Sequence, residues 1–340
     1  MRNAVFVDYS DMARYRLMKK IKPYCTGDIF FFNPVKLRFY DSLGRGIKFS
    51  IFRKKYFDDS VLIVTGHRPW DLLLTIFWKK KQKKVFYVQH AKYTSEVNRT
   101  MSLSLALLVK AYSVILPSII LFFVVGAKSA YYAFAGRFRH KYIYKFRAAV
   151  PISRYDYCFV YDDKWEKYHK NLFGEDKVLK VGFFDFNDGL IIDKCESRRI
   201  VYVLHAFYED GVYKLSYCDE VISFLKRISK KNDVPIVFKP HPRSVGVVKE
   251  RFAKYFEETN ILYRSDVVLG HYSTIMSMAK SSGNQVFTIN VNAVKIPLEV
   301  KGDYDVINSD AVIDFSKRKS LLKREKTFST FKAIAEKIFE

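Results

Sequence analysis

Short runs of β-branched and aromatic residues alternate with longer amphipathic runs along this chain, and that alternation constrains its fold most strongly. In the first half the short runs are AVFVDY (4–9), GDIFFFN (27–33), SVLIVTG (60–66), KVFYVQH (84–90), YDYCFVYD (155–162) and KVLKVGFF (177–184). The stretch WDLLLTIFWKKK (70–81) between them is typical of a helix. Continuous apolar strands that alternate with helices indicate parallel sheets covered on both faces. The sequence therefore predicts an α/β fold.

The second half repeats this pattern. It predicts strands over 198–206, 234–241, 265–270 and 284–291, with helices over 213–231, 248–259 and 273–282 and a last helix within 316–340. The pattern is interrupted near 185–198, within the stretch FNDGLIIDKCESRR. A chain of 340 residues suits two domains. We therefore expect two Rossmann-like domains facing across a cleft, an N-terminal one over 1–185 for the acceptor and a C-terminal one over 186–340 for the donor.

One apolar segment does not fit the alternation. LSLALLVKAYSVILPSIILFFVVGA (103–127) has 25 residues with one charge, Lys110, and one proline, Pro117. About 20 apolar residues span a bilayer, but a single span would separate the two domains. We expect instead an interfacial or re-entrant helical hairpin bent near Pro117, within a membrane-contacting insertion at about 100–150. Basic residues that follow it favour an anionic leaflet. The alternative is a buried helix pair.

Charge and cysteine content narrow the classes of function. The chain has 59 Lys and Arg against 35 Asp and Glu, a net charge of +24. Such an excess indicates a polyanionic partner: nucleic acid, an anionic membrane or a phosphorylated substrate. Four cysteines without a CxxC pair argue against a disulfide framework or a zinc site, and the N-terminus lacks the features of a signal peptide. Neither G-x-G-x-x-G nor the P-loop occurs, which disfavours NAD and ATP.

Polar residues gather after three predicted strands of the second half. The strand ends read HAFYEDG (205–211), KPHPRS (239–244) and GHYST (270–274). Ligands of open α/β sheets bind beyond the carboxyl ends of the strands, so these three stretches are the candidate site.

Each stretch offers a different chemical group. A carboxylate of Glu209 or Asp210 can act as a general base, and His241 can donate a proton or hydrogen bond to a leaving phosphate. Ser273 and Thr274, at a predicted helix N-terminus, can bind a phosphate. Taken one at a time, a turn, a strand terminator and an ordinary N-cap remain alternatives. We expect Lys239, Arg243 and His271 to add positive charge to the same edge.

The motifs EDG (209–211), HP (241–242) and ST (273–274) resemble the motif set of bacterial sialyltransferases and polysialyltransferases. The resemblance implies two Rossmann-like domains of the glycosyltransferase B-type and a CMP-activated sialic acid donor, with no metal or other cofactor in the chemistry. It implies that Asp210, or else Glu209, is the general base and that His241 assists departure of CMP. Ser273 and Thr274 then bind its phosphate. The donor site is completed by Gly211, Lys239, Pro242, Arg243 and His271.

A weaker resemblance concerns the first half. The stretch VFYVQHAKY (85–93) is similar to a strand ending in Gln-His-Gly in glycerophosphate and other polyol-phosphate transferases, with Ala91 in place of the glycine. That resemblance implies a CDP-activated donor. His67 and His90 end strands of the first domain and are candidate acceptor contacts, with turn or core histidines as the alternative.

These features predict a metal-independent inverting glycosyltransferase that transfers sialic acid or a similar sugar from a CMP-linked donor. The expected acceptor is a hydroxyl of a glycan or glycolipid destined for a capsule or lipopolysaccharide, or lipooligosaccharide. We expect a peripheral or monotopic enzyme on the cytoplasmic face of a bacterial inner membrane. The alternatives are a polyol-phosphate transferase of cell-wall or capsule synthesis and a basic nucleic-acid-binding protein. The latter is disfavoured because no recognised nucleic-acid motif occurs, so we expect no nucleic-acid partner.

Overall fold

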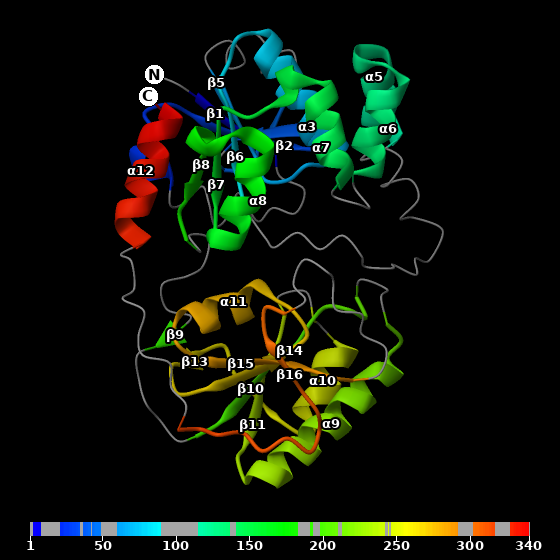
Figure 1. Cartoon of the computed structure of the whole chain (residues 1–340), viewed down its shortest axis with the longest axis vertical. Helices are drawn as coiled ribbons and strands as arrows, with labels where there is room; N and C mark the ends of the chain where they lie inside the picture. The colour runs from blue at the N-terminus through cyan, green and yellow to red at the C-terminus, as the bar shows by residue number, and fades with distance from the viewer. Residues whose placement is uncertain are drawn as a thin grey trace. The chain divides into compact units, whose positions relative to one another are not determined.

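The computed structural model describes residues 3–7, 21–34, 37–41, 43–48, 60–89, 115–136, 141–182, 191–192, 198–209, 213–241, 244, 246–291, 302–316 and 327–339. The chain divides into two compact units (Figure 1). The first holds β1 to β8 and the final helix, and the second holds β9 to β16.

The first unit is built on an eight-stranded sheet. In spatial order its strands are β4 (Gly46–Ile47), β3 (Arg38–Asp41), β2 (Ile29–Asn33), β1 (Asn3–Val7), β5 (Ser60–Val64), β6 (Val85–Val88), β7 (Tyr157–Val160) and β8 (Val178–Lys180). The six strands from β2 to β8 in this order pair in parallel, as their continuous apolar sequences predict. The hairpin of β3 and β4 adds an antiparallel edge that the sequence did not indicate.

The helices of this unit are α3 (Pro69–Lys80), α5 (Leu116–Val125), α6 (Ala127–Ala135), α7 (Lys141–Ala149), α8 (Asp163–Phe173) and α12 (Thr327–Phe339), with short 3-10 turns η2 (Lys22–Tyr24), η4 (Pro151–Ser153) and η5 (Glu175–Lys177). These helices lie against the sheet or, like α5 and α6, pack on α3 and α7. The helix predicted over 70–81 is α3. Asp162 caps α8, because its carboxylate accepts a hydrogen bond from the Trp165 N–H.

The apolar segment is described only from Ile115 onward. Residues 103–114 lie outside the described part of the chain. From Leu116 the segment is helical, and Pro117 lies in the first turn of α5, where its missing N–H costs no hydrogen bond. Within the described residues the chain turns at Gly126, whose φ of 83° favours a residue without a Cβ. The bend expected near Pro117 stays a prediction, because the residues before 115 lie outside that part of the chain. Within the described ranges, no helix has the length and apolar character needed to cross a membrane.

The last helix corrects the predicted domain boundary. We assigned all of 186–340 to the second domain, but α12 belongs to the first unit. Its buried Ile334 and Ile338 join the core of the first sheet, where they cluster with Phe6, Phe31 and Phe159. The ammonium of Lys337 lies 5.8 Å from the centre of the Tyr157 ring of β7. The amphipathic pattern predicted this helix but not the sheet on which it packs.

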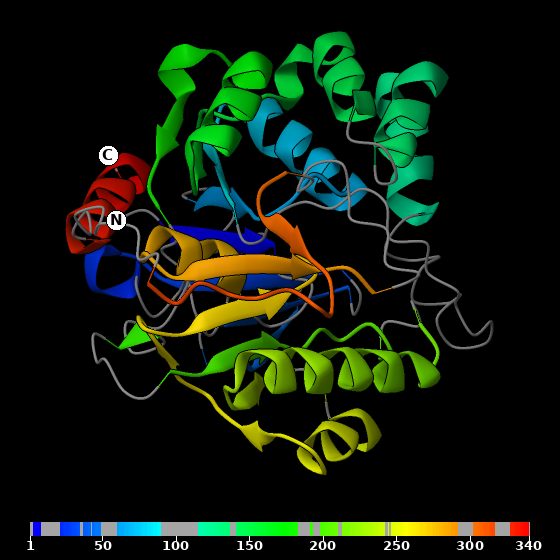
Figure 2. The same cartoon turned by 60° about the horizontal axis from the view of Figure 1, so that its bottom comes forward.

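The second unit is built on a six-stranded, fully parallel sheet. In spatial order its strands are β12 (Glu257–Glu258), β11 (Ile236–Lys239), β10 (Ile200–Val203), β14 (Val267–Gly270), β15 (Gln285–Ile289) and β16 (Asp305–Ile307). A separate pair joins β13 (Leu262–Tyr263) to β9 (Ile191–Ile192). Helices α9 (Ser216–Asn232) and α10 (Val247–Ala253) lie on one face, and α11 (Thr274–Ser281) lies on the other (Figures 1 and 2).

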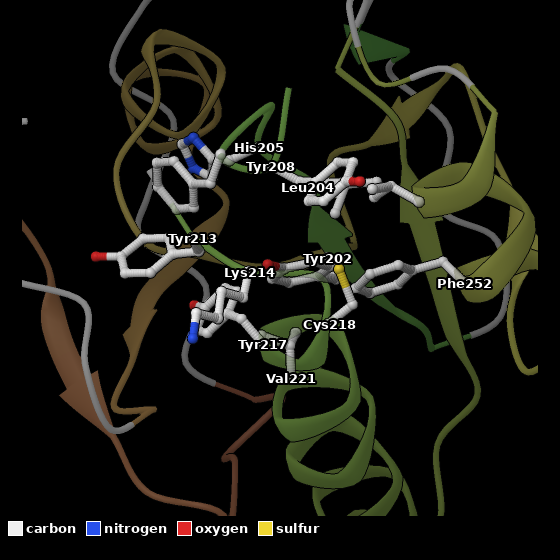
Figure 3. Close-up of a pocket in the computed structure, with 12 residues that line it drawn as sticks. Tyr202, Leu204, His205, Tyr208, Tyr213, Lys214, Tyr217, Cys218, Val221 and Phe252 are labelled. Carbon is white, nitrogen blue, oxygen red and sulfur yellow. The ribbon is translucent and has the colours of Figure 1, made fainter. Parts of the chain in front are cut away.

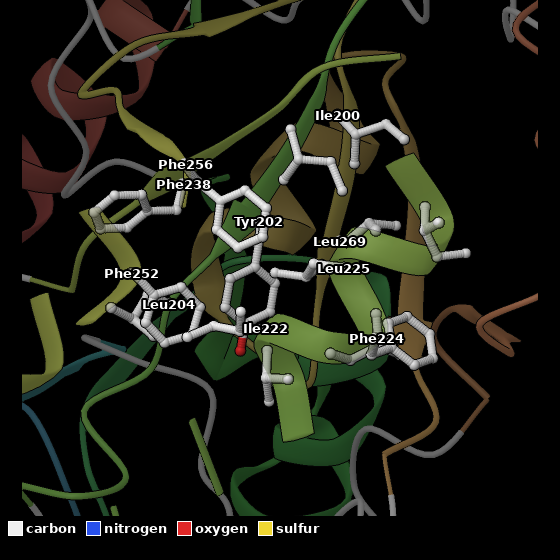
Figure 4. Packing of buried hydrophobic residues seen from close by; sticks show 14 of the residues in the cluster. Ile200, Tyr202, Leu204, Ile222, Phe224, Leu225, Phe238, Phe252, Phe256 and Leu269 are labelled. Carbon is white, nitrogen blue, oxygen red and sulfur yellow. The ribbon is translucent and has the colours of Figure 1, made fainter. Parts of the chain in front are cut away.

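Alternate residues of each strand face different helices. Tyr202 and Phe238 pack with Phe252 of α10 and with apolar side chains of α9 (Figure 4), whereas Val201 and Val237 pack with Met276 of α11. Both faces of the central strands are therefore buried, which explains their continuous apolar sequences.

The order of strands reverses its direction between β10 and β14. From β10 the chain adds β11 and then β12 on one side, and it later adds β14, β15 and β16 on the other. In open parallel sheets such a switch point leaves a crevice at the carboxyl ends of the two strands, where ligands bind. The second unit therefore has one position at which its sheet favours a ligand.

Candidate functional site

The sheet order brings the three predicted strand ends together. Strands β11, β10 and β14 are consecutive neighbours, and Val203 pairs with Lys239 while Tyr202 pairs with Leu269. The residues that follow these strands therefore emerge at one edge, with the switch point between β10 and β14 in their midst. His241 lies at this edge, half-buried.

His205 bridges the switch point. It follows β10, and its Nε2 accepts a hydrogen bond of 3.4 Å from the backbone N–H of Tyr272, which follows β14. Its ring stacks on Phe207 with centroids 4.6 Å apart. Burial lowers the pKa of His205 well below its usual value, and the nearby His271 and His241 lower it further. A neutral imidazole with Nε2 as acceptor is thus held in place by both strands.

His271 is fully buried beside it. The hydroxyl of Tyr217, from the start of α9, lies 2.5 Å from Nε2 of His271. Burial lowers the pKa of His271 to about 3, so its imidazole is neutral at pH 7. In contrast to the prediction, His271 adds no positive charge to this edge. It ties α9 to the end of β14 instead.

The loop GHYST continues into the N-terminus of α11. Ser273 is the N-cap, and its Oγ accepts a hydrogen bond of 3.2 Å from the N–H of Ile275. A Cβ on Gly270 would lie only 2.7 Å from the sulfur of Met276, so glycine allows α11 to pack closely on β14. The positive end of the α11 dipole, together with Ser273 and Thr274, thus lies at the switch point. This is the placement that the sequence predicted.

Two other predicted site residues, Glu209 and Lys239, have polar groups that are buried or bonded within the fold. The carboxylate oxygens of Glu209 are buried, and its charge helps raise the pKa of Cys218 to about 11, after the larger effect of burial. Glu209 therefore lies near the start of α9, not in bulk solvent. Lys239 donates a 2.9 Å hydrogen bond to the backbone carbonyl of Asn260 and is 8% exposed. Its ammonium is used within the fold.

Four predicted residues of this site, Asp210, Gly211, Pro242 and Arg243, lie outside the described residues, as does His90 of the first unit. Among the residues that are described, no group of three or more His, Cys, Asp or Glu side chains could hold a metal ion. Metal independence remains a prediction.

A hollow adjoins the site on the α9 and α10 side of the sheet. His205, Leu204 and Tyr208 lie along one side of it, and Tyr217, Cys218 and Val221 of α9 lie along the other (Figure 3). Its volume is about 10 Å³, the room needed for one water molecule. A shallower hollow of about 450 Å³ lies between α9 and the end of β15, and its lining includes Asp219, Arg227 and Asn290.

No chemical role was predicted for three residues of this site, His205, Tyr217 and Tyr272. His205 carried a usable signal, because it directly follows a continuous apolar strand. Tyr217 carried none, since its contact with His271 joins residues 54 positions apart.

Buried neutral histidines make stability depend on pH. Burial lowers the pKa of His271 to about 3 and that of His169 in α8 to about 4, against 6.5 for the unfolded chain. Below pH 6.5 the unfolded chain binds protons that the folded chain does not, so the free energy of unfolding falls as pH falls. Urea unfolding at about pH 7.5, 6 and 5 is expected to show this decrease before most carboxylates titrate. Equal stability at all three pH values would contradict the buried, neutral state.

His67 of the first unit is a core residue. It is 5% exposed, and its ring stacks on Tyr87 with centroids 4.7 Å apart. Its Nδ1 lies 3.1 Å from the hydroxyl of Tyr155, which donates a hydrogen bond to the carbonyl of Gly66. Arg147, also buried, stacks on the Tyr155 ring at 4.0 Å. His67 is therefore a core histidine, which was the alternative to the expected acceptor contact.

Comparison with known proteins yields matches of fold only. No protein-family model matches the chain, and no characterised protein sequence matches it. The UDP-GlcNAc 2-epimerase of Methanocaldococcus jannaschii, in complex with UDP-GlcNAc and UDP, is similar with a TM-score of 0.50 at 11% identity, over 99% of this chain and 100% of that one.

Two further solved structures have lower scores. The glycotransferase of kitacinnamycin has a TM-score of 0.46 at 9% identity, over 99% of this chain and 94% of its own. TarM, known from S. aureus, has a TM-score of 0.37 at 12% identity, over 88% of this chain and 57% of its own. Of these three structures, the epimerase alone has a TM-score of 0.50, and at 11% identity its similarity concerns the fold. The predicted α/β class with Rossmann-like sheets is confirmed.

Proposed function

We propose that this chain is a glycosyltransferase that binds a nucleotide-sugar donor at the β10–β14 switch point of its second unit. The observation that carries the proposal is the meeting of His205, His241 and the N-terminus of α11 at that point. The M. jannaschii epimerase, which has a similar fold, is described in complex with UDP-GlcNAc and UDP. That complex supports a nucleotide sugar as the class of ligand.

Each group at this site has a separate role in the proposed reaction. The α11 N-terminus, with Ser273 and Thr274, binds the phosphate of the donor. The carboxylate of Asp210, or of Glu209, takes the proton of the acceptor hydroxyl. The hydroxyl oxygen forms a bond to the anomeric carbon as the bond from that carbon to the phosphate oxygen breaks, and the electron pair leaves with the nucleotide. His241 donates a hydrogen bond or a proton to that leaving oxygen. Attack from the opposite face inverts the configuration.

The donor in this proposal is CMP-linked, and its sugar is sialic acid or a similar one. This finer assignment rests on the resemblance of EDG, HP and ST, in this order, to the motif set of bacterial sialyltransferases, and each motif lies at or after a strand end of one sheet. A glycan or glycolipid destined for the cell surface is the proposed acceptor. A CDP-linked polyol donor would use the same phosphate site, so the nucleotide must be tested directly.

Cytidine nucleotides are expected to protect the protein from thermal unfolding. A ligand at about a hundred times its Kd adds about 2.7 kcal/mol to stability, which raises Tm by roughly 4 °C for a protein of this size. Differential scanning fluorimetry with CMP, CDP and UDP, and then with their sugar and polyol conjugates, measures the shift.

A variant of Ser273 tests whether the nucleotide that protects the protein binds at the N-terminus of α11. Glycine is nearly as good an N-cap as serine, so Ser273→Gly is expected to keep the stability of the free protein but to reduce the shift with CMP. Protection by UDP but not by CMP would indicate that the donor is a UDP-sugar and not CMP-sialic acid. If no nucleotide raises Tm, the proposed function is wrong.

A further inference from the structure

Helices α5 and α6 expose apolar side chains that the core of the first unit does not use. On α5, Ile119 and Phe122 are each 50% exposed and Phe123 is 80% exposed. On α6, Tyr131 is 56% exposed and Phe134 is 40% exposed. In all of α5 only Pro117 and Leu121 are buried. We call Ile119, Phe122, Phe123, Tyr131 and Phe134 the apolar patch. On each helix these side chains are three or four positions apart and so share one face, and the two helices pack on each other. Exposed apolar side chains gathered in this way mark an interaction site.

The charge around the apolar patch has one sign. Residues 100–155 contain no Asp or Glu, although they include eight Lys or Arg residues. Lys128 is exposed on α6 three residues before Tyr131, and Lys141 and Lys145 are exposed on α7, whose Tyr142 ring contacts the Tyr131 ring. Lys145 lies over the rings of Tyr132 and Tyr142, with its ammonium 5.8 Å and 5.4 Å from their centres. Tyrosine and lysine next to exposed phenylalanine are typical of residues at a membrane interface.

We infer that the apolar patch inserts into the interfacial layer of an anionic bilayer, with Lys128, Lys141 and Lys145 at the lipid headgroups. A ten-residue helix such as α5 is only about 15 Å long, against about 30 Å of hydrocarbon, so this surface lies in the interface and does not span it. A second copy of the chain is a poorer occupant, because facing patches would bring six lysines of the same sign together. This inference does not depend on the proposed sugar transfer.

Vesicle binding tests the inference. The purified full-length chain is mixed with vesicles of phosphatidylglycerol and phosphatidylcholine, or of phosphatidylcholine alone, and bound protein is measured by sedimentation. We expect binding to the anionic vesicles and much weaker binding to the neutral ones. Binding is also expected to weaken when salt rises from about 0.1 M to about 1 M, because the Debye length falls from about 10 Å to about 3 Å.

Variants separate the apolar and the charged contributions. Phe122→Ser combined with Phe123→Ser is expected to reduce the partition coefficient at least tenfold, since two largely exposed phenyl groups no longer insert. Lys128→Gln, Lys141→Gln and Lys145→Gln together are expected to reduce it about tenfold or more on anionic vesicles only. The control Val312→Ser removes an apolar side chain that is 74% exposed on the second unit, and it is expected to bind like the unchanged chain.

Three results would overturn the inference. The first is that the unchanged chain does not bind anionic vesicles. The second is that the variant with both Phe122→Ser and Phe123→Ser binds them as well as the unchanged chain does. In the third, gel filtration shows a dimer that the Phe substitutions disperse while vesicle binding is absent, and a second copy is then the occupant of the apolar patch. Thermal unfolding of each variant serves as the check of folding, and because the replaced phenyl groups are exposed, their Tm values are expected to stay close to that of the unchanged chain.

Discussion

His241→Ala is expected to slow sugar transfer by about a hundredfold or more, which is the usual contribution of a general acid or of a hydrogen bond to a leaving group. The residue follows β11, next to the β10–β14 switch point, and its proximity to His205 helps lower the pKa of that residue, after the larger effect of burial. Because the leaving phosphate gains charge mainly in the transition state, the loss is expected in kcat and less in KM. Steady-state transfer from the donor identified by thermal protection measures both.

His241→Gln separates the two possible roles of this residue. Glutamine can donate a hydrogen bond but cannot supply a proton at neutral pH. Recovery of most of the activity in His241→Gln indicates hydrogen bonding, and a loss equal to that of His241→Ala indicates proton transfer. A rate for His241→Ala within a few fold of the unchanged enzyme would remove His241 from the proposed mechanism and leave it as the end of a strand.

Asp266→Ala is expected to destabilise the second unit by about 3–5 kcal/mol, because it leaves a largely buried guanidinium without its partner. The Asp266 side chain is 0% exposed, and the Arg199 side chain is 15% exposed. Arg199 donates from Nε and Nη2 to the two carboxylate oxygens at 2.7 Å and 3.1 Å. The N–H of Tyr263 donates a third hydrogen bond to Asp266. Urea unfolding of the full chain measures the loss.

The control for Asp266→Ala is an ion pair of the same kind on the surface. Lys180 and Asp163 lie 2.6 Å apart, and their side chains are 39% and 84% exposed. Exposed pairs contribute no more than about 1 kcal/mol, so Lys180→Ala is expected to change stability little. Similar losses for the two variants would show that burial does not set the strength of the Arg199–Asp266 pair.

The central strands of both sheets were predictable because burial on two faces demands continuous apolar sequence. The edges were not. In the hairpin of β3 and β4 the turn is built by Asp41, whose carboxylate accepts hydrogen bonds from the N–H groups of Leu43 and Arg45. Strand β16 is DVI, and two of its three residues are exposed. Short, half-exposed edge strands lack the pattern that identified their neighbours.

The strand ends that form the site were predictable for the same reason as the strands themselves. The direction in which each side chain points could not be predicted from the sequence. Lys239 shares the face of β11 with Val237, and its ammonium reaches Asn260 at the side of β12 and not the switch point. His271 was predicted at the correct strand end with the wrong charge, because a sequence does not show that a residue after a strand is covered by Tyr217. Position follows from sequence pattern, whereas burial follows from tertiary packing.

The placement of α12 makes the first unit discontinuous in the chain. Its core closes only when Ile334 and Ile338, which follow the second unit in the chain, pack against strands that precede that unit. During synthesis the second unit is therefore complete before the first can finish folding. A chain cut after the first eight strands lacks Ile334 and Ile338, so truncation at that point leaves the core of the first unit incomplete.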